Sequence, residues 1–258
     1  LQAVIIFSFS VNREQPVILS RKGFSCSESK LDRTGRKSMG WHISDAAELE
    51  EAIMNLKVML ARKAGATKGM VVVDVGCGQG GFTAALSSAV GEQGSVVSVD
   101  VTDEYLEEFK DRLKRRGFPK NVSFIRADAI NLRGVVADGF ADVVASYRFL
   151  EELKQPKNIT NIVQEMTRIA KENGRVSIIE MSTEPTNEAE EAYIRLHRES
   201  GDNLFEPHEI TKAMNQARLG KVRVEKVETE IWFSPDLAKQ YLSHAQVWYN
   251  ADVEKSLG

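Results

Sequence analysis

A short glycine-rich stretch, Gly76–Gly81, carries the pattern in this sequence that points most directly to ligand chemistry. Its glycines have the spacing GxGxxG, which lets the backbone turn tightly, approach a ligand closely and present free N–H groups at the start of a helix. The apolar run 70–75 predicts a buried strand before the turn, and 82–90 predicts a helix after it. A tight strand-to-helix turn that binds no ligand is the alternative interpretation.

Two carboxylates narrow the choice of ligand. Asp100 follows the next predicted strand, 95–99, where an acid can accept hydrogen bonds from ribose hydroxyls. Asp74 ends the strand before the glycine turn, and its charge would repel a pyrophosphate but suits a ligand that carries an ammonium group. S-adenosylmethionine has a ribose, an adenine, a sulfonium and an amino-acid end, and it has no phosphate.

From about residue 45 to 233, the sequence resembles the class I S-adenosylmethionine-dependent methyltransferases. The segment VVVDVGCGQGGFT (71–83) is similar to their first motif, [VIL]-[DE]-x-G-x-G-x-G. Further similar segments are VVSVDVT, FIRADAINL, FADVVASYRFLEEL (140–153) and GRVSIIE (174–180). The closest branch is the small-molecule one that includes the quinone-biosynthesis enzymes. These motifs specify the cofactor and leave the substrate open.

The resemblance implies S-adenosylmethionine as cofactor and a role for each matching residue. Asp74 would act on the amino group of the ligand, directly or through water, and Asp100 would hold the ribose hydroxyls. Asp128 would accept from the adenine amino group beside the backbone N–H of Ala129, although Asp128 could instead cap a turn. The implied cofactor-binding residues are Asp74, Gly76, Cys77, Gly78, Gly80, Asp100, Val101, Asp128, Ala129 and Ser146.

The sequence assigns no catalytic residue. Methyl transfer from a sulfonium is an in-line displacement that mainly needs proximity and alignment, and a base is needed only when the acceptor must lose a proton. The resemblance implies that Tyr147 flanks the transferred methyl group. Tyr193 and His197 are further candidates, because the segment 182–218 that contains them is placed to form a helical lid. An ordinary packed connection is the alternative for that segment.

The arrangement of predicted elements from residue 41 onward indicates the fold class. Helices and strands alternate, as in a doubly wound, mostly parallel α/β sheet with helices on both faces, the Rossmann-like fold of the resembled family. The segment 221–233 alternates apolar and polar residues, and we expect it to form an antiparallel edge strand. A last helix is predicted from Pro235. We expect 41–258 to be a single domain.

The first forty residues have a different character. They hold seven basic and three acidic residues, and 20–40 shows no apolar period. We therefore expect 1–40 to be a flexible arm outside the fold, with 1–38 a candidate for absence from the native product. The apolar start, 1–11, lacks the preceding basic residues of a signal peptide, which favours a terminal strand or a disordered tail.

Composition restricts the partners and the compartment. The 34 basic and 37 acidic residues give no electrostatic case for a nucleic-acid partner, and no apolar run approaches the roughly 18 residues of a membrane span. The two cysteines, Cys26 and Cys77, and the four histidines form no recognisable disulfide framework or metal site, which favours a cytoplasmic location. The segment 146–149, Ser-Tyr-Arg-Phe, lacks the Asn/Asp-Pro-Pro-aromatic motif of enzymes that methylate exocyclic amines of bases.

We therefore predict an S-adenosylmethionine-dependent methyltransferase that acts on a small organic acceptor, without a metal. Two alternatives remain: an NAD(P)-dependent oxidoreductase that uses the overlapping GxGxxG, which Asp74 disfavours, and a non-catalytic protein that binds adenosylmethionine for regulation. The acceptor, the methylated atom and the oligomeric state stay open.

Overall fold

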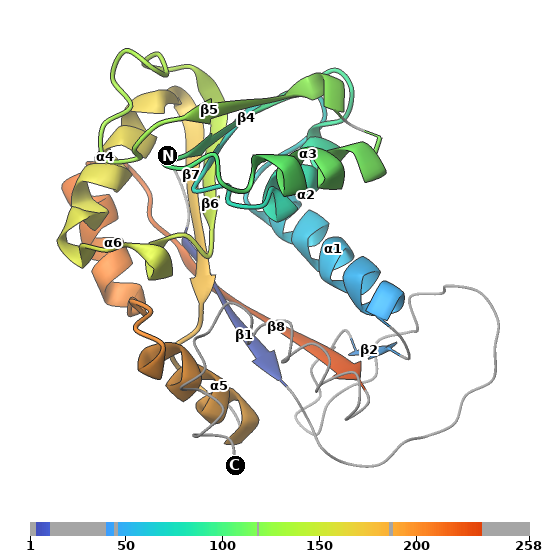
Figure 1. The fold of residues 1–258 in the computed structure, drawn as a ribbon. Coiled ribbons are helices and arrows are strands. Elements are labelled where there is room, and N and C mark those ends of the chain that lie inside the picture. The colour runs from blue at the N-terminus through green and yellow to red at the C-terminus, as the bar shows by residue number, and fades with distance from the viewer. Residues whose placement is uncertain (1–3, 11–39, 44–45, 118, 186–187, 234–258) are drawn as a thin grey trace. The chain divides into compact units, whose positions relative to one another are not determined.

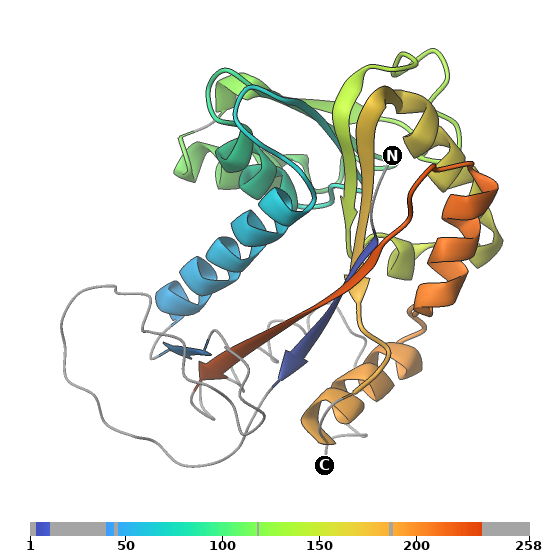
Figure 2. The ribbon, with the colours of Figure 1, turned by 180° about the vertical axis from the view of Figure 1, so that it is seen from behind.

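The computed structural model describes residues 4–10, 40–43, 46–117, 119–185 and 188–233 (Figure 1, Figure 2). Contacts within the chain divide it into two units, each made of three stretches of sequence. The first unit comprises 1–7, 53–183 and 201–226. The second comprises 8–52, 184–200 and 227–258. Every residue that the sequence predicts to bind the cofactor belongs to the first unit.

A parallel sheet forms the centre of the first unit. Its strands pair in the spatial order β5-β4-β3-β6-β7, and each of these pairs is parallel. Numbered from β3 along the chain, this order is 3-2-1-4-5, which confirms the predicted doubly wound fold. The strands are β3 (Val71–Val75), β4 (Ser95–Asp100), β5 (Val122–Arg126), β6 (Ala141–Tyr147) and β7 (Ala170–Met181).

Helices cover both faces of this sheet. Figure 1 and Figure 2 show α2 (Gly81–Val90) and α3 (Leu106–Arg115) on one face, and α4 (Ile159–Ile169) and α6 (Pro207–Gln216) on the other. The helix α1 (Ala46–Lys63), from residue 53 onward, lies on the side of α2. In the described part of the chain, no helix combines the length and the apolar run that a membrane crossing needs.

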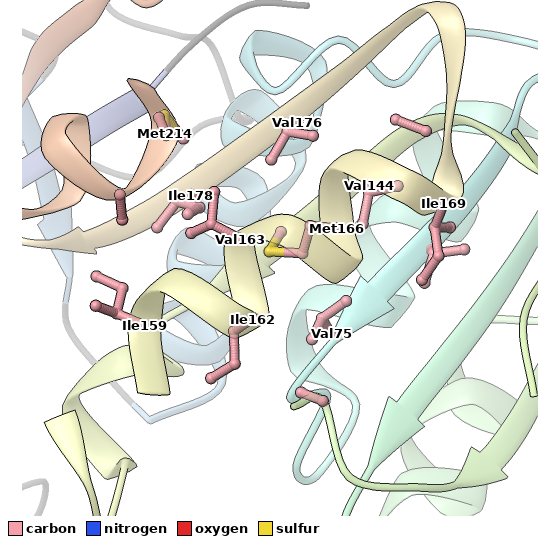
Figure 3. Packing of buried hydrophobic residues seen from close by; sticks show 14 of the residues in the cluster. Val75, Val144, Ile159, Ile162, Val163, Met166, Ile169, Val176, Ile178 and Met214 are labelled. Carbon is pink, nitrogen blue, oxygen red and sulfur yellow. The ribbon is translucent and has the colours of Figure 1, made fainter. Parts of the chain in front are cut away.

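The core on the α4 side follows the predicted helical period. Ile162, Met166 and Ile169 recur at spacings of three and four residues, and all three are fully buried. They pack against strand residues of β6 and β7, among them Val144, Val176 and Ile178 (Figure 3). Strands that receive helices on both faces must be apolar throughout, which explains the valine-rich runs of the sequence.

Part of the predicted arm lies in the sheet. Val4–Ser10 forms β1, which pairs in parallel with β7, with Val4 opposite Ile178. A terminal strand was one of two alternatives for 1–11, and an apolar segment of this kind can satisfy the unpaired backbone groups of a neighbouring strand. Residues 11–39 lie outside the described residues, so the domain boundary at residue 40 stays a prediction.

The second unit contains β2 (Gly40–Ile43), α5 (Glu188–Glu199) and most of β8 (Val224–Phe233). β8 pairs with β2 in parallel, with Gly40 opposite Glu230, whereas we expected 221–233 to be an antiparallel edge strand. The direction of a pair depends on the partner strand, and alternation within one segment carries no information about that partner. The helix predicted from Pro235 lies outside the described residues.

We predict that Met166→Ala lowers the free energy of unfolding by about 2–5 kcal/mol, because a fully buried side chain leaves a cavity between α4 and the sheet. Urea denaturation of the purified protein measures this loss. Gln164→Ala is the matched control, since Gln164 is exposed on the same helix, and its change should stay within about 0.5 kcal/mol. Equal losses in the two variants would contradict the packing described above.

Candidate functional site

The glycine turn between β3 and α2 has the backbone conformation that its sequence predicts. Gly76, Gly78 and Gly80 have φ angles of 72°, 47° and 75°, in the left-handed region that disfavours other residues. A Cβ atom at Gly76 would overlap the Phe149 ring, and one at Gly80 would crowd Phe109. A Cβ at Gly78 would meet nothing within 4 Å. Gly78 therefore exposes bare backbone to open space, as close approach of a ligand requires.

Asp100 is joined directly to this turn. Its Oδ2 accepts a hydrogen bond of 2.8 Å from the backbone N–H of Gly78, and its Oδ1 accepts one of 3.2 Å from Thr102. The neighbouring Val101 is a large apolar side chain that is 63% exposed. The end of β4 thus presents a carboxylate and an apolar surface side by side, next to the open glycine.

Asp74 lies inside the sheet at the end of β3, with 1% of its surface exposed. Its Oδ2 accepts a hydrogen bond of 2.5 Å from the Thr83 hydroxyl of α2, whereas Oδ1 finds no hydrogen-bond partner among the described residues. Burial raises the pKa of Asp74 to about 7, and the charge of Asp100 adds to this, against the Thr83 hydrogen bond and the Lys57 ammonium. The buried Oδ1 of Asp74 is therefore suited to accept a hydrogen bond from a ligand.

Lys57 on α1 is a site residue that the sequence analysis missed. Burial lowers the pKa of Lys57 to about 8, and the charges of Arg112 and Arg148 act in the same direction, against Asp74. Its Nζ lies 5.3 Å from the centre of the Tyr147 ring. A signal was present in the sequence, because Lys57 stands four residues after Ile53 and three before Leu60 and so shares the buried face of the helix.

Tyr147 and the loop that follows β6 lie at the same edge of the sheet. The Tyr147 ring stacks on Phe82 of α2, with centroids 5.1 Å apart. The preceding Ser146 is fully buried, and its hydroxyl has no hydrogen-bond partner in the described structure. Arg148 adopts a φ of 50°, which is uncommon outside glycine and marks a backbone held by its surroundings.

The other implied residues fit the site to different degrees. Asp128 is exposed, and its Oδ1 accepts a hydrogen bond of 2.9 Å from the Ile130 N–H, so the turn-capping alternative is realised in this structure. Ala129 beside it is buried. Cys77 is also buried, and desolvation raises the pKa of its thiol, which argues against a thiolate role. The ligand-binding roles of these three residues stay predictions.

The candidate lid residues belong to the second unit. His197 on α5 is 1% exposed, whereas the side chain of Tyr193 on the same helix lies outside the described ones. Contact of either residue with an acceptor stays a prediction. Within the described ranges, no group of three or more His, Cys, Asp or Glu side chains could hold a metal ion.

Comparison with known proteins relates the chain to one enzyme family. A family model described as a methyltransferase domain matches residues 66–232. The ubiquinone/menaquinone biosynthesis C-methyltransferase UbiE of Idiomarina loihiensis is 36% identical over 121 residues, which are 46% of this chain and 45% of that protein. UbiE of Yersinia pestis bv. Antiqua is 31% identical over 132 residues, 50% of this chain and 51% of that protein. The chain spans about half the length of these curated relatives.

Solved structures share the fold at low sequence identity. An S-adenosylmethionine-dependent methyltransferase from Aquifex aeolicus has a TM-score of 0.52 and 23% identity, with 67% of this chain and 82% of that chain covered. Geranyl diphosphate C-methyltransferase from Streptomyces coelicolor A3(2) has a TM-score of 0.53 and 17% identity, with 67% and 62% covered. These likenesses support the predicted doubly wound fold.

We predict that Gly76→Ala destabilises the protein more than Gly134→Ala. Both glycines have a positive φ, 72° and 77°, but only at Gly76 would the new methyl group overlap another side chain, Phe149. The excess loss in the free energy of unfolding should be about 1–3 kcal/mol, the usual cost of overpacking. Urea denaturation of both variants measures it. Equal losses would show that Phe149 does not lie against Gly76.

Proposed function

Since the chain belongs to the class I S-adenosylmethionine-dependent methyltransferases, we propose that it transfers the methyl group of S-adenosylmethionine to a small organic acceptor. The observation that carries this proposal is the junction of the open Gly78 backbone with the Asp100 carboxylate, together with a buried Asp74 whose Oδ1 has no hydrogen-bond partner among the described residues. No other part of the described chain combines these features with a matching sequence motif.

The site fits the chemical groups of this cofactor. Asp74 offers a carboxylate oxygen to the ammonium of the methionyl end, whose positive charge would offset the cost of burying that oxygen. Asp100 offers charged acceptors to the ribose hydroxyls. The exposed Val101 offers an apolar surface to the adenine ring. Asp128 is proposed to accept from the adenine amino group, and Ala129 to supply a backbone N–H.

Methyl transfer from S-adenosylmethionine requires little acid–base catalysis by the protein. The bound cofactor supplies an electrophilic methyl group on a positively charged sulfur. The residues of this chain orient the donor, keep water from the reacting atoms and hold the acceptor in line, which is where proximity and alignment act. Ser146 and Tyr147, at the end of β6, are the residues proposed to flank the methyl group.

A small organic acceptor is supported by several observations. The curated relatives are quinone-biosynthesis C-methyltransferases, and one fold neighbour is a methyltransferase of geranyl diphosphate. The near-balanced total of 34 basic and 37 acidic residues gives no electrostatic case for a nucleic-acid partner. An oxidoreductase that binds a dinucleotide is disfavoured by Asp74, whose carboxylate would repel a pyrophosphate. The cytoplasmic location and the lid role of 182–218 stay predictions that the described residues do not test.

An acceptor screen tests the proposed function. The purified protein is incubated with S-adenosylmethionine and a library of phenols, quinols, amines and carboxylic acids, and formation of S-adenosylhomocysteine is measured for each. Turnover with one class of acceptor would support the enzyme and identify the class of its substrate. Cofactor binding without turnover across the library would favour a regulatory binding protein, and binding of NAD instead would contradict the cofactor assignment.

We predict that Asp100→Ala weakens binding of S-adenosylmethionine about ten- to a hundredfold, because the ribose hydroxyls would lose a charged acceptor worth roughly 1.5–3 kcal/mol. Isothermal titration calorimetry measures the affinity. Asp103→Ala is the matched control, since Asp103 is exposed three residues further along and should leave the affinity unchanged. If the two variants bind equally well, the ribose role of Asp100 is wrong.

We predict that affinity for S-adenosylmethionine rises with pH between 5 and 7. Burial raises the pKa of Asp74 to about 7, so below pH 7 the neutral carboxyl must lose a proton before it can pair with the ligand ammonium. The affinity should rise by up to about tenfold per pH unit and then level off. Calorimetry in buffers with different ionisation enthalpies measures the released proton.

Asp74→Asn provides the control for this pH dependence. The variant should bind more weakly at pH 7 and should lose the rise in affinity between pH 5 and 7, because the amide does not titrate. A wild-type affinity that is flat over this range would refute the pairing of Asp74 with the ammonium group. The pH range of this test, 5 to 7, stays below the pKa of Lys57, which burial lowers to about 8, so the titration of Asp74 is not confused with that of Lys57.

A further inference from the structure

The loop after β6 depends on a single carboxyl group for two of its backbone hydrogen bonds. β6 ends at Tyr147, and after Arg148 the backbone N–H groups of the loop need acceptors other than strand carbonyls. The N–H groups of Phe149 and Leu150 both donate to Oε1 of Glu180, at 3.2 and 3.0 Å. Leu150 is fully buried and Glu180 is nearly so, so water has little room to replace this acceptor.

The same loop is held at further points. The N–H of Arg148 donates to the carbonyl of Ile179 at 2.7 Å, and its Nε donates to Glu151 at 2.8 Å. The backbone N–H of Asn203 donates to the Glu151 carbonyl at 2.9 Å. Arg148 keeps a φ of 50° here, and a non-glycine residue remains in that region only when its surroundings over-determine it.

The loop in turn contacts the glycine turn. The Phe149 side chain covers the Cα of Gly76 so closely that a methyl group there would overlap the ring. The Gly76 N–H donates to the Val99 carbonyl at 2.9 Å, which fixes the turn from its other side. The turn is therefore held between β4 and Phe149, and the position of Phe149 depends on the acceptor provided by Glu180.

We propose that Glu180 is a positioning residue of the cofactor site, which holds Phe149 against Gly76 and so keeps the glycine turn in the form that accepts S-adenosylmethionine. The inference rests on the proposed function, because it concerns the same cofactor site. Glu180 itself need not touch the cofactor. It acts through the backbone of Phe149 and Leu150, from the neighbouring strand β7.

The charge state of Glu180 suggests which substitution should preserve its role. Burial and the neighbouring Glu151 carboxylate raise the pKa of Glu180 to about 8, against the hydrogen bonds from Phe149 and Leu150 and the charge of Arg148. This shift favours the neutral acid form of Glu180. Glutamine keeps an acceptor oxygen at the same position, and it has the same shape and charge as that acid.

The test compares Glu180→Gln, Glu180→Ala and Phe149→Ala in the full chain, by calorimetric titration with S-adenosylmethionine. Glu180→Ala and Phe149→Ala should each weaken binding about tenfold or more, since the first leaves two backbone N–H groups without their acceptor and the second removes the covering ring. Glu180→Gln should bind within about threefold of the wild type. The double variant Phe149→Ala with Glu180→Ala should be no weaker than the worse single variant, as expected of residues that act in series.

Asp142→Ala separates positioning from a general loss of stability. Asp142 also accepts a backbone N–H of a neighbouring strand, that of Val71 at 2.9 Å, but it lies at the amino-terminal start of β6, at the opposite edge of the sheet. Thermal unfolding of each variant is measured beside its affinity. Asp142→Ala should lower the unfolding temperature while its affinity stays within about twofold of the wild type.

The results of these titrations distinguish a failure of the proposed function from a failure of the proposed role of Glu180. A wild-type protein that does not bind S-adenosylmethionine would overturn the proposed function. If the wild type binds S-adenosylmethionine, two results would overturn the role of Glu180 alone. One is an unchanged affinity of Glu180→Ala, and the other is a Glu180→Gln variant that binds as weakly as Glu180→Ala. If Glu180→Ala does not fold, the Phe149→Ala and Glu180→Gln affinities decide the question, and a Phe149→Ala that binds like the wild type overturns the inference.

Discussion

Carboxyl groups at the carboxyl-terminal edge of the parallel sheet accept hydrogen bonds from groups that the ends of the strands leave without partners. Asp100 accepts the N–H of Gly78 in the glycine turn, and Glu180 accepts two N–H groups of the loop after β6. Asp74 accepts the hydroxyl of Thr83 on α2. Because all strands run in the same direction, these acids come from β3, β4 and β7 but meet at one edge, where they shape the backbone around the proposed cofactor.

This concentration of acids has an electrostatic consequence. Burial raises the pKa of Asp74 to about 7 and lowers the pKa of Lys57 to about 8, so the pKa values of both groups lie close to neutral pH. Among the described residues, Oδ1 of Asp74 is buried and accepts no hydrogen bond, so this oxygen is suited to a donor from a ligand. A ligand with a positive group would complete the arrangement, which is a physical reason to favour S-adenosylmethionine over a dinucleotide.

The proposed cofactor residues and the predicted acceptor residues belong to different units of the structure. Every proposed cofactor residue belongs to the first unit, and the methyltransferase model matches 66–232. Tyr193 and His197, the predicted acceptor residues, belong to the second unit, and His197 is buried. The chain spans about half the length of its curated relatives, which are named for ubiquinone and menaquinone biosynthesis, so that pathway guides only the choice of acceptors for the screen.

The sequence by itself determined the features that depend on neighbours along the chain. Continuous apolar runs predicted the strands of the sheet, and the period of 3.6 residues predicted its helices. The GxGxxG spacing with Asp100 predicted the turn and its acid, because turn geometry and strand ends are local properties. Tertiary structure decided the contacts between distant segments. Nothing local to Glu180 reveals that it holds Phe149, a residue 31 positions earlier, or that Phe149 covers Gly76. The surroundings that lower the pKa of Lys57 and the parallel pairing of β8 with β2 likewise depend on which segments meet in space, and a one-dimensional pattern does not contain that information.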